Sequence, residues 1–428
     1  MNPTIRLPAL LVAASLALFV LPSRADAAKP AVPTSFYGTL LAHRPDVPAM
    51  TALGRALFFD PRLSASGSMS CASCHSPAHA YGPPNGLAVQ LGGRDGKLQG
   101  GRAVPSIRYV QGVPSFTEHF FEGGDDGNDS EDQGPVGGHT WDGRAQSVHE
   151  QARLPLLSPL EMANPSPADV VDKLRRAGYV EQLGKVFGKD VIANDTQVFN
   201  GALLALEVFQ QSPAEFYPYS SKYDAYLHGQ AKLSAQEARG LSVFNDANKG
   251  NCASCHVSAM KQGVLPAFSD WGFIALGVPR NPGIAANRDK AYYDLGLCGP
   301  ERKDLSSKPE YCGLFRTPSL RNVATRKAFF HNGSFHSLED VVAFYATRDT
   351  APQRWYHRDA HGKVLKYDDL PARYQDNVNT DGPFGGKVGA KPSMTPAEIK
   401  DVVAFLKTLN DGYVPPGAGK AAQAAAHR

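Results

Sequence analysis

The pentapeptide Cys-Ala-Ser-Cys-His occurs twice in this 428-residue chain, at positions 71–75 and 252–256. A C-x-x-C pair followed directly by histidine is the attachment pattern of c-type haem, in which two thiols bond to the haem vinyl groups and the histidine binds the iron. A four-cysteine zinc site or two disulfides would also use C-x-x-C pairs, but neither explains the two histidines. Two covalently bound haem c groups are expected, held by these residues: Cys71, Cys74, His75, Cys252, Cys255 and His256.

The N-terminus has the features of a secretory signal peptide. Arg6 is followed by an apolar run over residues 10–21 and by Ala-Asp-Ala at 25–27. A basic start, a short apolar segment and small residues at the cleavage site define this class of leader. A membrane anchor is the alternative, but the run is short for a span. We expect residues 1–27 to be removed and the mature protein to be soluble and periplasmic, without a membrane span.

Charge and the remaining cysteines narrow the possibilities further. The net charge is +3 and no basic run is present, so nothing favours nucleic acid binding. Residues 125–132 are acidic and predict a solvated surface loop, with a cation or a basic redox partner as the alternative ligand. Cys298 and Cys312 remain after haem attachment, and an oxidising compartment favours a disulfide between them.

Periodicity predicts a mainly α-helical chain with long loops and few strands. Helix patterns or start signals occur at these positions: 51–63, from 141 to 151 onward, 167–176, 195–211, 235–244, from 337 onward, and 395–409. The haem motifs lie far apart, which predicts one haem per domain. We expect two cytochrome c-like haem domains packed face to face, at residues 28–220 and 221–416, followed by a flexible tail at 417–428.

Several segments resemble the bacterial dihaem cytochrome c peroxidase family, including its MauG-like branch. The resemblance covers about residues 51–412 and is carried by these segments: Leu-Phe-Phe-Asp-Pro-Arg-Leu-Ser at 57–64, Trp-Asp-Gly-Arg-Ala at 141–145, Gln151, Pro155, Glu161-Met162, Phe-Arg-Thr-Pro-Ser-Leu-Arg-Asn-Val at 315–323, and Phe-His-Asn-Gly at 330–333. It implies a peroxidatic haem in the N-terminal domain and an electron-transfer haem in the C-terminal domain.

The resemblance also implies roles for three side chains. Trp141 would lie between the haems and relay electrons, although a tryptophan in the core is the ordinary alternative. Gln151 and Glu161 match residues on the distal side of the peroxidatic haem. A positioned carboxylate with a pKa near neutrality can move a proton between the two peroxide oxygens, so Glu161 is the expected acid–base residue.

The expected axial ligands on the far side of each iron differ from those of many family members. Peroxidases of this family often carry a second histidine sixteen residues after the first haem histidine, where this chain has Leu91. His79 is too close to His75 to reach the opposite face, so we expect an open first haem. At the second haem, counting from the Phe-His-x-Gly motif places Tyr345 where a methionine is common and where MauG-like enzymes have tyrosine. A phenolate ligand favours oxidised iron.

Calcium is a doubtful further cofactor. By resemblance, an interdomain calcium would use an asparagine where Ala103 stands and backbone carbonyls where Arg326 and Ala328 stand. Ala103 has no side-chain ligand, and Arg326 adds positive charge.

These features predict a periplasmic dihaem peroxidase that reduces hydrogen peroxide at the N-terminal haem. Electrons would be relayed through the C-terminal haem, and a high-valent diferryl-type state would form. The donor would be a diffusing partner: a small cytochrome c, a cupredoxin or an oxidisable protein. One alternative is a MauG-like oxidase that uses peroxide to oxidise residues of a partner protein. Another is a non-enzymatic dihaem electron carrier, which the absence of a second histidine and the presence of Glu161 disfavour.

Overall fold

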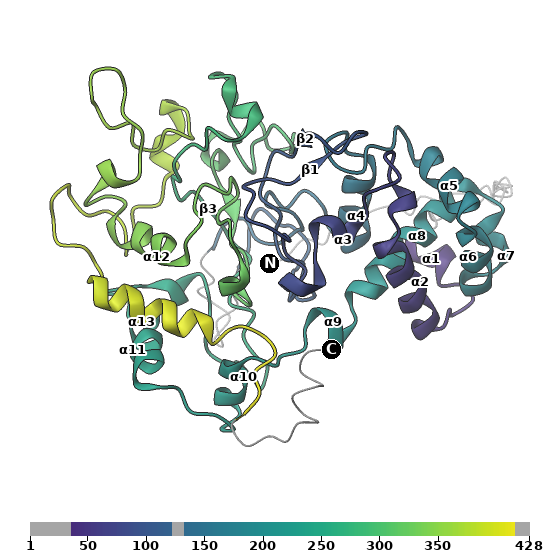
Figure 1. The fold of residues 1–428 in the computed structure, drawn as a ribbon, viewed down its shortest axis with the longest axis horizontal. Helices are drawn as coiled ribbons and strands as arrows, with labels where there is room; N and C mark the ends of the chain where they lie inside the picture. The colour runs from purple at the N-terminus through teal and green to yellow at the C-terminus, as the bar shows by residue number, and fades with distance from the viewer. Residues whose placement is uncertain (1–35, 122–131, 416–428) are drawn as a thin grey trace, which may run out of the picture.

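The computed structural model describes residues 36–121 and 132–415. Helices and irregular segments make up most of it, with two small antiparallel sheets (Figure 1). The expected signal peptide at 1–27, most of the acidic segment and the expected tail at 417–428 lie outside the described residues. The mainly α-helical prediction is confirmed.

The helices fall into an N-terminal and a C-terminal group (Figure 1). The N-terminal group consists of α1 (Phe36–Leu40), α2 (Val47–Phe59), α3 (Cys71–Cys74), α4 (Val148–Leu157), α5 (Pro167–Arg176), α6 (Tyr179–Phe187), α7 (Lys189–Ile192), α8 (Asp195–Gln210) and α9 (Pro213–Phe216). The C-terminal group consists of α10 (Lys222–Leu227), α11 (Ala235–Asn245), α12 (Leu338–Thr347) and α13 (Pro396–Lys407).

The strands are two residues long and pin loops together. β1 (Leu91–Gly92) pairs with β2 (Leu98–Gln99), so that Leu91 lies opposite Gln99. β3 (Phe273–Ile274) pairs with β4 (Phe315–Arg316), so that Phe273 lies opposite Arg316. Most of the chain near the two haem motifs is therefore irregular backbone held by side-chain contacts.

Each helix group has its own hydrophobic core. One buried cluster extends from Leu40 to Phe216, and a second extends from Tyr223 to Leu409. A third, small cluster surrounds the disulfide between Cys298 and Cys312, which forms as predicted. We propose a domain boundary between residues 220 and 221, because this point of the chain separates the two large cores.

A glycine allows close helix contact in each core. A Cβ atom on Gly54 of α2 would overlap the Ala205 carbonyl of α8, and one on Gly240 of α11 would overlap the Asp401 carbonyl of α13. These two helix pairs also make the most extensive helix–helix contacts among the described residues. Each half is thus built on a crossing that only glycine permits at that point.

Most of the predicted helices are present. The ranges 167–176, 195–211 and 235–244 match α5, α8 and α11 to within a residue at each end, because capping side chains start them. Thr395 forms a reciprocal capping box with Glu398, whereas Ser337 caps α12 only by accepting from the Asp340 amide. The short helices α1, α6, α7, α9 and α10 were not anticipated.

Two predicted helix starts were wrong. The first long helix begins at Val47, where Asp46 accepts a hydrogen bond from the Ala49 amide, and a 3₁₀ turn follows Asp60. The segment from 141 is a turn up to Ser147, and α4 begins only at Val148. Thr140 and Gly143 both have positive φ, which is incompatible with a right-handed helix.

The segments 117–121 and 132–136 pair with each other as a two-stranded stem, and this stem also contacts the C-terminal half. Thr117 exchanges backbone hydrogen bonds with Val136, and Phe121 forms a bridge with Asp132. Val136 also bridges to Gly272 of the C-terminal half. Phe121 and Asp132, which flank residues 122–131, are therefore held next to each other by this stem.

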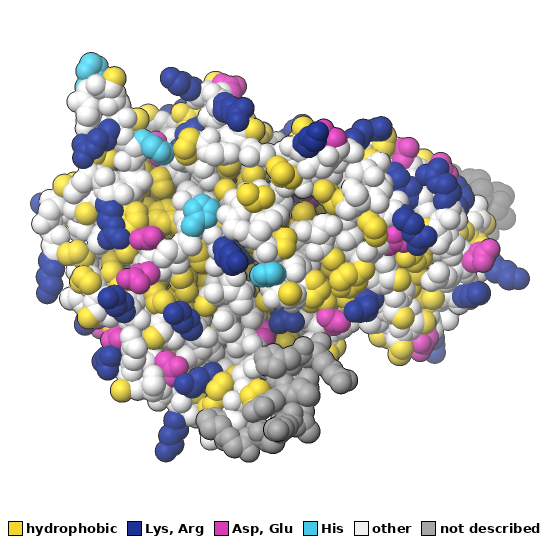
Figure 2. Space-filling model, viewed as in Figure 1, with side chains coloured by type: hydrophobic (Ala, Val, Ile, Leu, Met, Phe, Trp, Pro, Cys, Tyr) yellow, Lys and Arg dark blue, Asp and Glu magenta, His cyan; other side chains and the backbone are white. Residues whose placement is uncertain are grey.

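The described surface has no block of a single charge sign on the face shown in Figure 2, where basic and acidic side chains alternate. Within residues 36–121 and 132–415, no helix combines the length and apolar character that crossing a bilayer requires.

The close crossing of α11 and α13 gives a direct stability test. We expect Gly240→Ala to lower the free energy of unfolding by roughly 1–3 kcal/mol, because the new methyl group must displace backbone. Gly112→Ala is the control, since nothing lies within 4 Å of a Cβ there. Chemical denaturation followed by circular dichroism measures both, and equal stability of the two variants would contradict the packing argument.

Candidate dihaem site

The first haem motif is a short helix followed by a fixed histidine. Cys71 and Cys74 lie on α3, where the Ser70 backbone amide donates to the Ser73 hydroxyl. The His75 ring has its Nδ1 atom 3.1 Å from the Tyr81 carbonyl. This contact assigns the Nδ1 proton to a backbone acceptor and leaves Nε2 for iron, the usual arrangement of a ligating histidine.

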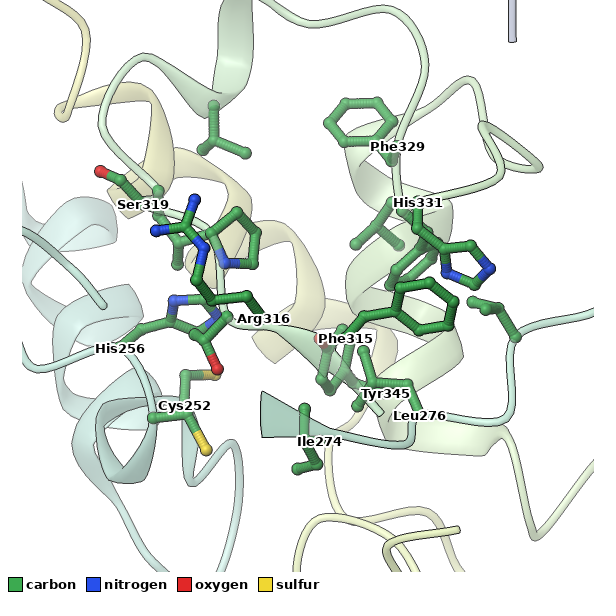
Figure 3. A pocket seen from close by; sticks show the side chains of 18 of the residues that line it. Cys252, His256, Ile274, Leu276, Phe315, Arg316, Ser319, Phe329, His331 and Tyr345 are labelled. Carbon is green, nitrogen blue, oxygen red and sulfur yellow. The ribbon is translucent and has the colours of Figure 1, made fainter. Parts of the chain in front are cut away.

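The second motif repeats this arrangement. Nδ1 of His256 lies 2.8 Å from the Phe268 carbonyl. Figure 3 shows Cys252 and His256 on one side of a cavity, with Tyr345 of α12 across from them. Burial raises the pKa of the Tyr345 phenol, and the Arg348 charge opposes the effect. The structure therefore brings together the residues predicted for the second haem.

The residues present fit covalently attached haem. The four motif cysteines are free thiols, whereas Cys298 and Cys312 are bonded to each other. Two buried nitrogens in the cavity wall have no hydrogen-bond partner among the described residues: Nη1 of Arg316 and Nε2 of His331. Buried polar atoms are rarely left unpaired, and such nitrogens suit the carboxylates of a haem.

His331 is held rigidly at this wall. Its ring stacks on Phe315 with 3.6 Å between ring centroids, and Nε2 lies 3.6 Å from an Asp369 carboxylate oxygen, too far for a hydrogen bond. Its backbone carbonyl accepts from the Ala103 amide of the N-terminal half at 2.7 Å. The Phe-His-Asn-Gly motif thus links the second cavity to the first half.

Glu161 lies near the first haem motif. Its charge adds to the burial that raises the pKa of the Cys71 and Cys74 thiols. Glu161 is an exposed residue, and partial desolvation of its carboxyl group raises its pKa to about 7. Arg144 partly offsets the rise and Glu301 adds to it. A carboxyl group with this pKa can both accept and donate a proton near neutral pH.

The backbone of Glu161 is held next to β1, the strand that carries Leu91 where many family members have a second histidine. The Glu161 carbonyl accepts from the Gly93 amide at 2.8 Å, directly after β1. Leu91 on that strand is 42% exposed, and the nearby His79 ring instead contacts the Ser76 hydroxyl at 3.2 Å. Gln151 lies half-buried on α4, in the helix that precedes Glu161.

Trp141 lies in a turn that is hydrogen-bonded to segments of both halves. Its indole N–H donates to the Ala103 carbonyl at 2.7 Å, and its own carbonyl accepts from the Arg316 amide at 2.8 Å. The indole lines the same cavity as His256 and Tyr345. Trp141 is therefore bonded to segments of both halves.

Asp142 fixes this turn by charge. It is fully buried and bonds to Arg102 and Arg144, each at 2.7 Å. Burial alone would raise the pKa of Asp142, but the two guanidinium groups lower it to about 2. Arg102 also bonds to Asp294 at 2.6 Å. The two guanidinium groups therefore keep Asp142 ionised at neutral pH.

A fully buried arginine supports the position of Tyr345. Arg348 follows α12, bonds to Asp349 at 2.7 Å and stacks on Phe384 at 3.8 Å. The Phe384 ring in turn lies 5.3 Å from the Tyr345 ring. No local sequence pattern predicts this arrangement, because the contacts join residues that only the fold brings together.

The position expected for calcium carries a different set of groups. Ala103 offers only its backbone, and its carbonyl already accepts from Trp141. The Ala328 carbonyl accepts from the Arg326 guanidinium at 3.2 Å. A calcium ion requires six to eight oxygen ligands, and a guanidinium group bound to one of them does not fit.

Comparisons with known proteins identify the family of the chain. The family description of di-haem cytochrome c peroxidase matches residues 48–232. The methylamine utilization protein MauG of Paracoccus denitrificans (strain Pd 1222) is 34% identical over 400 residues, which cover 89% of this chain and 93% of that protein.

Two solved structures are also similar. The diheme peroxidase BthA from Burkholderia thailandensis E264 has 40% sequence identity and a TM-score of 0.76, covering 87% of this chain and 89% of BthA. A MauG-like protein associated with microbial copper homeostasis has 26% identity and a TM-score of 0.60, covering 86% and 91% of the two chains. On its sequence, its fold and its two haem-attachment sites, the chain belongs to the di-haem cytochrome c peroxidase family of haem-containing oxidoreductases.

Proposed function

We propose that this protein reduces hydrogen peroxide at the haem held by Cys71, Cys74 and His75. The observation that carries the proposal is Glu161, a carboxyl group beside these thiols whose pKa is raised to about 7. The bound haem supplies an iron that accepts peroxide and takes up its oxidising equivalents. The chain supplies proton transfer, positioning and the path for electrons.

Glu161 is proposed to move the proton. Peroxide cleavage requires a proton to leave one peroxide oxygen and reach the other, so that water can depart. The carboxylate form of Glu161 accepts this proton and the acid form returns it. Gln151, on α4, is proposed to orient peroxide through its side-chain amide, and Arg144 holds part of the opposing charge near Glu161.

Trp141 and the second haem are proposed to carry electrons. The indole is bonded to the Ala103 carbonyl of one half, and the Trp141 carbonyl is bonded to Arg316 of the other. Tyr345 is proposed to hold the second haem together with His256, because it faces that histidine across the cavity. Phenolate ligation favours oxidised iron, so both haems would share the two oxidising equivalents of peroxide.

The electron source is proposed to be a diffusing donor such as a small cytochrome c or a cupredoxin. Tyr345 also favours a second candidate function, a MauG-like oxidase that passes the oxidising equivalents to side chains of a partner protein. We further propose a periplasmic location, which rests on the leader expected at residues 1–27.

The role of Glu161 can be measured by stopped-flow absorbance of the ferric protein with excess hydrogen peroxide. Because the carboxylate is the proton acceptor, the second-order rate constant should rise as pH increases through about 7. Glu161→Gln should lower the rate at pH 8 by about 10²-fold or more and abolish the pH dependence. Glu181→Gln, an exposed residue on α6, is the matched control. An unchanged profile in Glu161→Gln would remove this residue from the mechanism.

The role of Tyr345 can be tested with one equivalent of peroxide and no reductant. The wild-type protein should give a rapid, long-lived spectral change that involves both haems. Tyr345→Met should shorten its lifetime, because a thioether favours reduced iron. Tyr356→Phe is the control, since that buried tyrosine instead bonds to the Gly277 carbonyl at 2.5 Å. If the wild-type protein reacts only after one haem is reduced, the first haem site is closed at rest. The prediction that this site is open because Leu91 replaces a second histidine would then be wrong.

A further inference from the structure

Arg326 is half-buried, and no carboxylate among the described residues forms an ion pair with it. Among the buried arginines, Arg321 bonds to Asp224 at 2.8 Å and Arg348 to Asp349 at 2.7 Å, whereas Nε of Arg316 donates to the Thr140 carbonyl. Burial alone lowers the pKa of the Arg326 guanidinium to about 10, with no opposing charge nearby. A partly desolvated charge needs polar partners, which backbone carbonyls supply here.

The guanidinium group is bound by backbone carbonyls from both halves of the chain. Its Nη2 atom donates to the Val104 carbonyl at 3.0 Å, and its Nε atom donates to the Ala328 carbonyl at 3.2 Å. Carbonyl oxygens are also the neutral ligands that a hard metal cation takes in proteins. Arg326 thus makes the contacts of a cation that bridges the N-terminal and C-terminal halves.

Residues 103–105 contact Arg326 and also groups that line the cavity between the two halves. The Ala103 carbonyl accepts from Trp141 and the Ala103 amide donates to the His331 carbonyl. Val104 accepts from Arg326. Arg326 and Pro105 line the same cavity, and Nη1 of Arg326 lies 3.8 Å from a Cβ built on Gly82, which follows Tyr81, the residue whose carbonyl contacts the His75 ring.

We propose that the Arg326 guanidinium is the resident cation between the two haems, in place of a calcium ion, and that it raises the reduction potential of the haem attached at Cys71 and Cys74. A fixed positive charge near a haem stabilises the reduced iron, which carries one positive charge fewer, and the effect is strong where water is excluded. Because the cation belongs to the chain, neither chelators nor calcium alter it. This proposal is independent of the peroxide chemistry and requires only that the first haem is attached.

The first test uses the wild-type holoprotein. Its calcium content is measured by elemental analysis, and both haem potentials are determined by spectroelectrochemical titration before and after dialysis against EGTA. We expect substoichiometric calcium and unchanged potentials. One bound calcium per chain whose removal shifts either potential would overturn the proposal, whatever the variants do.

The second test compares charge at two neighbouring positions. Arg326→Gln should lower the potential of the His75 haem, whereas Arg326→Lys, which keeps the charge, should retain most of it. Lys327→Gln is the matched control, because Lys327 carries the same charge on an exposed side chain one residue away. Potentials are compared in variants whose denatured mass shows two attached haems. Equal shifts in Arg326→Gln and Lys327→Gln, or no shift in either, would refute the electrostatic role.

Discussion

The ion pairs of buried Asp142 hold the centre of this molecule together. The carboxylate accepts from Arg102 and Arg144, Arg102 continues to Asp294, and the Asp142 carbonyl accepts from Arg302 at 3.0 Å. Removing one partner from a buried charge network leaves the other charge uncompensated and is strongly destabilising. The turn that carries Trp141 is therefore fixed by electrostatics, since it has no regular secondary structure to support it.

The two haem sites share a proximal side and differ on the distal side. In both, Nδ1 of the motif histidine is directed at a backbone carbonyl, which orients the ring for iron. Beyond this, Glu161 stands near the first motif and Tyr345 faces the second. With the roles proposed for these two residues, one fold holds two chemically unlike haems, because the proposed distal groups come from loops and helices that are unrelated in the two halves.

Local signals predicted the parts of the structure that depend on local chemistry. Capping residues and apolar periodicity located α5, α8, α11 and α13, and the repeated pentapeptide located the two motifs where haem attachment is predicted. The turn at Trp141 was missed because its cause is non-local: Asp142 is held by Arg102 and Arg144, and Thr140 has positive φ. The contacts of Arg326 could not be predicted from local patterns either, since Val104 is 222 residues away along the chain.

The stem at Thr117–Val136 and Phe121–Asp132 has a consequence for protein engineering. Because its two strands are bonded to each other and to Gly272, the ends of the intervening segment stay together whatever lies between them. The entropic cost of closing a loop grows only slowly with its length. A reporter peptide or an affinity handle grafted between Phe121 and Asp132 would thus be carried on a clamped base, away from both haem-attachment motifs in sequence and without strain on the turn that carries Trp141.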